Sequence, residues 1–173
     1  MVDAQARLMV ASIAPDKTGM EKTKTDDAKT EDRKPEVIDG SRETVLIAED
    51  SLPNQKILQH LLVKLGYDVV ACNNGAEAWD KLHDPEIKNF VAILSDMMMP
   101  ELDGLSLLKK VRDDEKFKTI PFVFISAISD KDQIITAKAL KVNGYILKPV
   151  TFQKVLNKMK ELFPQRIFPK VAA

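Results

Sequence analysis

Residues Phe90 to Gly104, F-V-A-I-L-S-D-M-M-M-P-E-L-D-G, decide the fold of this 173-residue chain. Val91–Leu94 is a short, fully apolar run, typical of a strand that is buried on both faces of a parallel sheet. The run ends at Asp96, the first charged residue after it. A carboxylate at the carboxyl end of a central parallel strand lies where open α/β sheets place their ligands. Pro100 and Gly104 then interrupt any continuing element and shape the following loop.

Four further apolar runs alternate with amphipathic patterns along the chain. The runs predicted as strands are Thr44–Ala48, Tyr67–Ala71, Ile120–Ala127 and Tyr145–Leu147. The predicted helices lie between Ser51 and Leu65, over Ala76–Leu82, from Gly104 to about Val111, over Ser129–Val142 and over Phe152–Phe163. This alternation of strands and helices predicts a parallel sheet with right-handed crossovers and helices on both faces.

Two of the helical patterns carry more detailed expectations. Ser51 or Asn54 can cap the first helix, and Ile57 is expected on its apolar face together with the leucines that follow. In the helix Ser129–Val142, helical spacing predicts one apolar side that contains Ile134, Ile135, Ala139 and Leu140.

Charge and composition exclude several classes of protein. The chain has 26 Lys and Arg residues against 26 Asp and Glu residues, so its net charge does not favour nucleic acid or an anionic membrane as a partner. Cys72 is the only cysteine, which excludes an intrachain disulfide and fits a reducing compartment. No apolar run approaches the roughly 18 residues of a membrane span. The apolar patch Leu8–Ala14 makes a poor signal peptide, so we expect a cytoplasmic protein.

Composition also divides the chain into three parts. Of the 21 residues from Asp16 to Glu36, 13 are charged, and such a segment buries too little surface to offset the entropy lost on ordering. We therefore predict a disordered, mixed-charge extension over residues 1–40 and an ordered domain over residues 41–163. The tail over residues 164–173 is too short for a DNA-binding or catalytic domain, so no output domain is expected.

Residues suited to one chemistry follow four of the predicted strands. Glu49 and Asp50 follow the first, Asp96 the third, Ser126 ends the fourth, and Lys148 follows the fifth. The carboxyl ends of parallel strands share one edge, so these side chains are expected to converge. Clustered carboxylates repel each other unless a cation neutralises them, and their oxygen atoms suit Mg²⁺. With a lysine and a hydroxyl added, the set suits phosphoryl transfer, with Asp96 as the candidate nucleophile.

The chain from Arg42 to Phe163 resembles a response-regulator receiver domain of two-component signalling. The resemblance rests on the acidic pair Glu49-Asp50, on Asp96 followed by M-M-M-P-E-L-D-G, on Ser126-Ala127, on Tyr145, on Lys148-Pro149 and on the turn Asn73–Ala78. The opening E-D-S-L-P-N-Q is similar to receivers attached to hybrid sensor kinases. The resemblance implies a stand-alone, CheY-like receiver with a flavodoxin-like, doubly wound α/β fold and the strand order 2-1-3-4-5.

The resemblance also implies roles for the site residues. Asp50 and Asp96 would coordinate Mg²⁺ directly with the backbone carbonyl of Met98, and Glu49 would act through water. Asp96 would be the phosphoacceptor, and Lys148 would pair with the phosphoryl oxygens.

Two further positions are assigned to a conformational switch by the same resemblance. The Ser126 hydroxyl would bond a phosphoryl oxygen, and Tyr145 would be the switch aromatic. Glu at position 49 and Ser at position 126 depart from the commoner Asp and Thr, and both variants are tolerated in the family. The Lys148-Pro149 peptide bond is expected to be cis, because the turn must aim the lysine over the site and because cis is accessible at X-Pro bonds.

The implied function is that of a signalling module rather than an enzyme acting on other substrates. A sensor histidine kinase or a histidine phosphotransfer protein would donate the phosphoryl group. The face from Ser129 to Phe163 would bind a downstream protein, with a phosphorylation-dependent dimer as a further option. Neither nucleic acid nor a membrane is expected to bind directly.

Two competing functions remain open at this point. An Mg²⁺-dependent phosphatase with an aspartate nucleophile would need an acid or base two residues beyond Asp96, where this chain has Met98. A flavin or nucleotide binder would need a glycine-rich turn after the first strand, where this chain has E-D-S-L-P-N.

Overall fold

The computed structural model of the chain describes residues 42–127 and 131–169. The predicted extension over residues 1–40 therefore lies outside the described residues, and so do Ser129 and the last four residues of the tail. None of the helices in the described ranges has the length and apolar character needed to cross a membrane.

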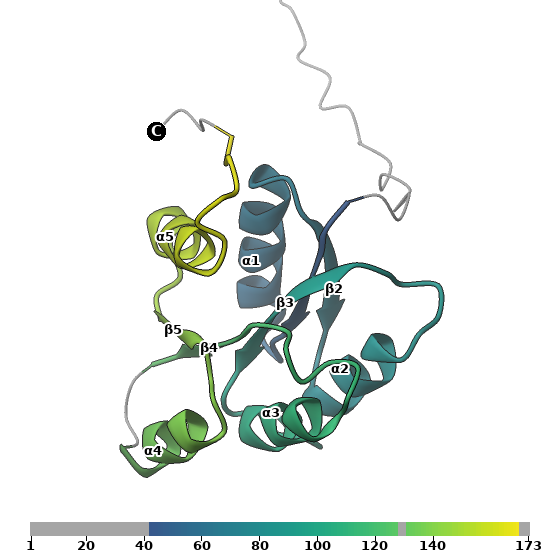
Figure 1. Cartoon of the computed structure of the whole chain (residues 1–173). Coiled ribbons are helices and arrows are strands. Elements are labelled where there is room, and N and C mark those ends of the chain that lie inside the picture. Colours follow the sequence, from purple (N-terminus) through teal and green to yellow (C-terminus); the bar gives the residue numbers. More distant parts are fainter. Residues whose placement is uncertain (1–41, 128–130, 170–173) are drawn as a thin grey trace, which may run out of the picture. The chain divides into compact units, whose positions relative to one another are not determined.

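The described strands form one parallel sheet of five strands. They are β1 (Thr44–Ala48), β2 (Asp68–Cys72), β3 (Phe90–Asp96), β4 (Phe122–Ser126) and β5 (Gly144–Leu147). Their order is β2-β1-β3-β4-β5, and every neighbouring pair is parallel. This order confirms the predicted doubly wound, flavodoxin-like fold, in which β3 is the central strand (Figure 1).

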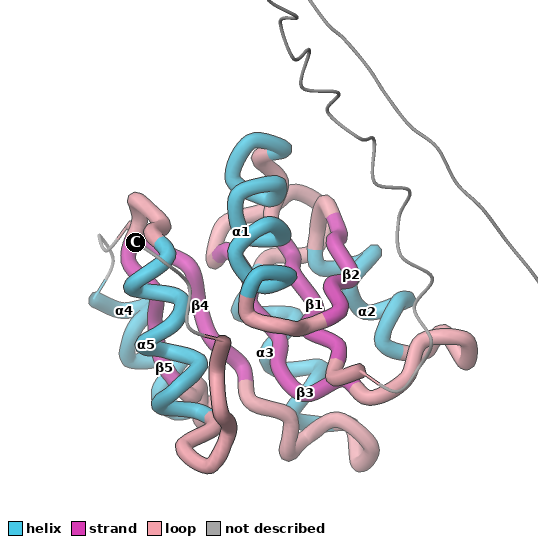
Figure 2. The backbone as a smooth tube through the Cα atoms, turned by 90° about the horizontal axis from the view of Figure 1, so that it is seen from above, coloured by secondary structure: helices cyan, strands magenta, loops and turns pink. Residues whose placement is uncertain are grey.

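Helices cover both faces of the sheet. They are α1 (Leu52–Lys64), α2 (Gly75–Leu82), α3 (Gly104–Asp113), α4 (Lys131–Ala139) and α5 (Phe152–Leu162). The buried side chains of α1 and α5 pack in one cluster against the sheet, whereas those of α2, α3 and α4 pack in a second cluster. Figure 2 shows the same division, with α1 and α5 on one side of the strands.

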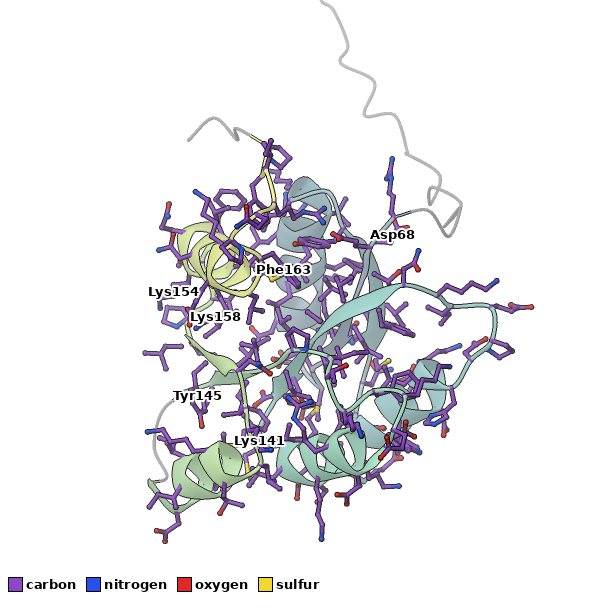
Figure 3. All side chains as sticks on the ribbon, in the orientation of Figure 1. Asp68, Lys141, Tyr145, Lys154, Lys158 and Phe163 are labelled. Atoms are coloured by element: carbon purple, nitrogen blue, oxygen red, sulfur yellow. The ribbon has the colours of Figure 1, made fainter. Side chains whose placement is uncertain are left out.

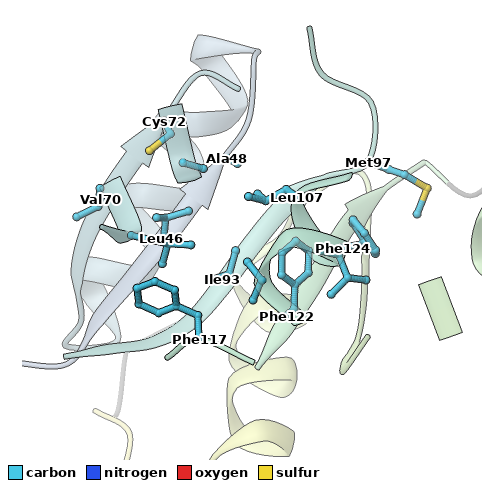
Figure 4. Close-up of a cluster of buried hydrophobic side chains, with 14 of the residues drawn as sticks. Leu46, Ala48, Val70, Cys72, Ile93, Met97, Leu107, Phe117, Phe122 and Phe124 are labelled. Carbon is cyan, nitrogen blue, oxygen red and sulfur yellow. The ribbon is translucent and has the colours of Figure 1, made fainter. Parts of the chain in front are cut away.

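The core is built from the strands, which are apolar on both faces as the sequence predicts. All five residues of β1 are buried, and the cluster in Figure 4 joins Leu46 and Ile93 to two phenylalanines of β4, Phe122 and Phe124. Leu107 of α3 closes this cluster from the helix layer. Each such side chain contributes about 1.5–3 kcal/mol when it is fully buried.

The first helix differs from the sequence expectation in two respects. Ser51 occupies the N-cap position but its side chain makes no capping hydrogen bond. Asn54 does not cap either, because it lies inside the first turn of the helix, and its side-chain amide donates to Glu49. The placement of Ile57 on the apolar face is wrong: its side chain is 48% exposed. Leu58 and Leu62 fill the contact with the sheet, and a residue adjacent to Leu58 in a helix is turned about 100° away from it.

The apolar side predicted for the fourth helix is also wrong in part. Ile135 is 64% exposed and Ala139 is exposed, whereas Ala137 is fully buried. The helix ends at Ala139 rather than at Val142, and Lys141 nearby adopts a left-handed φ of 58°. Ala137 makes the buried contact of α4, and Ile135, two residues before it, is turned about 200° away around the helix.

Gly104 brings the start of α3 close to the end of the central strand. Its amide donates to the Met97 carbonyl at 3.0 Å. A Cβ atom at this position would overlap the Asp96 carbonyl oxygen and would lie 2.8 Å from the Phe124 ring. The glycine therefore allows the loop after β3 to close tightly beneath Asp96.

We expect Gly104→Ala to destabilise the fold by about 1–3 kcal/mol, because the added methyl group must displace backbone as well as a ring. The free energy of unfolding from urea titration, followed by circular dichroism, measures this loss. Ser106→Ala on the same helix is the control and should change stability by less than about 0.5 kcal/mol. Equal stability of the two variants would contradict the close packing described for Gly104.

Candidate functional site

The residues singled out by the sequence meet at the carboxyl edge of the sheet. Glu49 and Asp50 directly follow β1, and Asp96 is the last residue of β3. Ser126 is the last residue of β4, and Lys148 directly follows β5. The parallel register brings these strand ends side by side, because Ala48 pairs with Ser95 and Ser126 pairs with Leu147. The predicted convergence is therefore observed.

Three carboxylates form the acidic part of the site. One oxygen from each of Glu49, Asp50 and Asp96 lies within 4.8 Å of the others. Glu49 is fully buried and Asp96 is only 8% exposed, whereas Asp50 is open to solvent. Glu49 Oε2 is buried without a hydrogen-bond donor among the described residues. A hard, oxygen-preferring cation such as Mg²⁺ fits this donor set, because it would compensate clustered negative charge and an unsatisfied oxygen.

Lys148 supplies the positive charge of the site. Its Nζ atom hydrogen-bonds Asp96 Oδ2 and Glu49 Oε1, the latter at 3.3 Å, and lies 3.1 Å from Glu49 Oε2. Burial disfavours the charged form of the lysine, but the hydrogen bonds and charges of Asp96 and Glu49 outweigh this effect and raise its pKa. The ammonium therefore remains charged through the neutral range, and its contribution to stability is lost only as pH rises through the raised pKa.

A backbone hydrogen bond and a cis peptide bond fix the backbone of Lys148. Its amide donates to the carbonyl of Ser126 at 2.9 Å, which extends the β4–β5 pairing by one residue. The Lys148-Pro149 peptide bond is cis, as predicted from the sequence.

The loop after Asp96 turns back over the carboxylate. The Met98 amide donates to Asp96 Oδ1 at 3.3 Å, so the two oxygens of Asp96 have different partners. Met97 is buried in the core, but the Met98 side chain is 65% exposed beside the site. Met98 thus meets the site through its backbone rather than through a reactive side chain.

A cavity of about 440 Å³ extends from the site toward α4. Its lining includes Asp96, Ser126, Ile134, Tyr145 and Lys148. Figure 3 shows Tyr145 at β5 on the side that faces α4, and its hydroxyl donates to the Ile134 carbonyl at 3.4 Å. Partial burial raises the pKa of this tyrosine. The cavity therefore connects the carboxylate Asp96 with the proposed switch residues.

Sequence reasoning missed two amides that belong to this site. Gln55 was not singled out, and Asn54 was considered only as a helix cap. Gln55 donates to the carbonyls of Glu49 at 3.2 Å and Cys72 at 3.0 Å, and Asn54 donates to the Glu49 carboxylate at 3.1 Å. The only signal in the sequence was their position in the first helical turn after an acidic pair.

Comparison with known proteins agrees with this geometry. The sequence model of the response regulator receiver domain matches residues 45–160. The chain is 41% identical over 117 residues to the chemotaxis protein CheY1 of Helicobacter pylori, covering 67% of this chain and 93% of that protein. It is 35% identical over 119 residues to the CheY homolog of Campylobacter jejuni, covering 68% and 90% of the two chains.

Solved structures show the same fold. CheY4 of Vibrio cholerae superposes with a TM-score of 0.66 at 25% identity, covering 71% of this chain and all of that one. The receiver domain of a sensor histidine kinase from Pseudomonas aeruginosa, solved with magnesium in its active site cleft, gives a TM-score of 0.64 at 23% identity, covering 72% and 100%. The chain belongs to the response regulator receiver domain family of two-component signal transduction.

Proposed function

We propose that this receiver accepts a phosphoryl group on Asp96 and responds by changing a protein-binding surface. The observation that carries the proposal is the environment of Asp96. Its carboxylate is nearly buried at the end of the central strand, lies among two further carboxylates, and is hydrogen-bonded by Lys148. An aspartate held in this way can act as a nucleophile toward phosphorus, because a cation beside it can offset the negative charge of the incoming phosphoryl oxygens.

Asp50, Asp96 and the backbone carbonyl of Met98 are the proposed direct ligands of Mg²⁺, and Glu49 is proposed to act through water. The proximity of the three carboxylates and the unsatisfied Glu49 Oε2 support this assignment. Bound Mg²⁺ would neutralise negative charge on the carboxylates and on the incoming phosphoryl oxygens.

The proposed phosphoryl transfer uses three side chains of the protein, those of Asp96, Lys148 and Ser126. A carboxylate oxygen of Asp96 forms a bond to phosphorus while the bond from phosphorus to the leaving nitrogen of a phosphohistidine breaks. The freed electron pair stays on the imidazole. Lys148 lies next to the attacking group and pairs with the phosphoryl oxygens, and the Ser126 hydroxyl donates to one of them. Both residues line the same cavity as Asp96.

The Ser126 and Tyr145 side chains are proposed to form the switch. Movement of the serine hydroxyl toward a phosphoryl group vacates space within the cavity that both residues line. Tyr145 can then rotate inward and give up its weak bond to Ile134, which is 3.4 Å long. A hydrogen bond contributes about 0.5–1.5 kcal/mol, or about 1.5–3 kcal/mol when it involves a charged group, so phosphorylation can only bias two conformers that are already close in energy.

The proposed partners follow from this chemistry. A sensor histidine kinase or a histidine phosphotransfer protein donates the phosphoryl group in the cytoplasm. A downstream protein, or a second copy of the chain, reads the face of α4, β5 and α5. Tyr145 lies within this face, which exposes Ile135 and Leu147. The chain catalyses only its own phosphorylation and dephosphorylation.

Replacement of the proposed nucleophile is the most direct test. Intact-mass analysis after incubation with acetyl phosphate and Mg²⁺ should show one added phosphoryl group on the wild type and none on Asp96→Asn, and EDTA should abolish the addition. Asp103→Asn is a matched control in the same loop, because Asp103 caps α3 rather than lying in the site. Metal-dependent phosphorylation retained in Asp96→Asn would refute the assignment.

Lys148→Met is expected to separate cation binding from phosphoryl transfer. The Lys148 ammonium repels a divalent cation at the neighbouring carboxylates. Removing its charge should therefore strengthen Mn²⁺ binding several-fold, because charges interact strongly at short range. The same change should slow phosphorylation by acetyl phosphate about tenfold, because one charge that stabilises the transition state is lost. Calorimetric titration and the phosphorylation rate measure the two effects. Weaker metal binding with an unchanged rate would contradict this role.

Beryllofluoride, which mimics a phosphoryl group, should perturb the proposed output face. Amide chemical shifts are expected to change at the acid site and also at Ser126, Ile134 and Tyr145, because these residues line one cavity with Asp96. Asp68 at the amino end of β2 serves as the internal reference, since β2 is farthest from β5 in the sheet order and this end of the strand lies away from the acid site. Shifts confined to the acid site would show that this face does not read the phosphorylated state.

A further inference from the structure

Glu49 is held unevenly, because both of its carboxylate oxygens lie near the Lys148 ammonium but only one of them has a second donor. A fully buried carboxylate requires donors or positive charge around it. Oε1 accepts from Asn54 Nδ2 at 3.1 Å and from Lys148 Nζ at 3.3 Å. Oε2 lies 3.1 Å from the same Nζ but accepts no hydrogen bond from the described residues. Asn54 therefore fixes which oxygen is occupied and which one remains available.

Gln55 holds the backbone of the same residue. Its side-chain amide donates to the Glu49 carbonyl at 3.2 Å and to the Cys72 carbonyl at 3.0 Å, with Asn73 Oδ1 farther away at 3.4 Å. The Cys72 carbonyl also accepts from the Glu49 amide at 3.1 Å. The β1–β2 ladder ends at Ala48 and Cys72, so Gln55 continues the pairing of the two strands beyond their last residues.

The start of α1 explains how two neighbouring residues reach one acid. Side chains in a helix lean toward its N-terminus, and here that direction leads back to the loop after β1. Pro53 lies in the first turn and has no N–H to cap, and the side-chain amides of Asn54 and Gln55 donate to Glu49 rather than to the helix. Gln55 is itself 91% buried, and its side chain donates to groups at the ends of β1 and β2, so it fixes the loop that carries the acidic pair.

We propose that Asn54 and Gln55 are positioning residues of the cation pocket. Asn54 bonds Oε1 and so orients the Glu49 carboxylate, which leaves Oε2 with the Lys148 ammonium as its near neighbour, and Gln55 fixes the backbone that carries Glu49 and Asp50. The proposal rests on the proposed function for the identity of the cation, but the orientation of Glu49 can be tested without any metal. Partners that orient metal ligands in this way typically change metal affinity by about 10- to 100-fold.

Asn54→Ala tests the carboxylate contact. We expect Mn²⁺ to bind about tenfold more weakly in calorimetric titration of the full chain, because Glu49 must then be ordered by the metal itself. Gln59→Ala is the matched control, since Gln59 is an exposed amide one turn farther along α1, and it should bind Mn²⁺ as the wild type does. Gln55→Ala should also weaken Mn²⁺ binding, and it should in addition lower the melting temperature, because the Glu49 carbonyl loses its side-chain donor and the Cys72 carbonyl keeps only the Glu49 amide.

A metal-free crystal structure of Asn54→Ala supplies the second measurement. The expected result is a rotated Glu49 side chain, with Oε1 no longer fixed between residues 54 and 148. An unchanged Glu49 together with wild-type Mn²⁺ affinity would overturn the proposal. If the wild type binds no Mn²⁺, the proposed function is contradicted. The metal-free structures still decide whether Asn54 positions Glu49. Weakened binding in Gln59→Ala equal to that of Asn54→Ala would also count against the proposal.

Discussion

One ammonium group holds the functional edge of this protein together. Lys148 reaches the carboxylates of Asp96 and Glu49, so a single cation joins the ends of β5, β3 and β1. Two largely buried carboxylates beside each other would be unstable without it. The exposed Asp50 needs no such partner within the protein, and this difference leaves room for a second cation beside the first. The site thus combines a permanent positive charge with a place for an exchangeable one.

The sequence predicts most of this arrangement because strand ends are simple to locate. Apolar runs such as Val91–Leu94 mark buried parallel strands, and a charged residue just after such a run, as Asp96 is here, lies at the carboxyl edge of the sheet. Helix faces are harder to predict, as Ile57 and Ile135 show. Both fit a helical pattern, but which side of the helix faces the sheet is set by packing: Leu58 and Ala137 are buried, whereas Ile57 and Ile135 are exposed. That choice is a property of the tertiary structure.

The roles of Asn54 and Gln55 could not be predicted for a different reason. An amide can cap a helix, face solvent or bond a distant carbonyl with similar energy, and composition does not distinguish these uses. The partners of Gln55 include the carbonyl of Cys72, which is 17 residues away along the chain and adjacent only once β1 and β2 have paired. Such contacts are selected by topology, whereas the carboxylates Asp50 and Asp96 owe their places to their own strands.

The central position of β3 also has a consequence for folding. The strand pairs with β1 on one side and β4 on the other, and the ion pair between Glu49 and Lys148 joins residues 99 positions apart. Contacts this distant in sequence raise the contact order of the domain and form only after long loops have closed. During synthesis, the acidic pair and Asp96 emerge well before their lysine. The complete site therefore exists only in chains that have finished folding, and a ligand bound there stabilises that state alone.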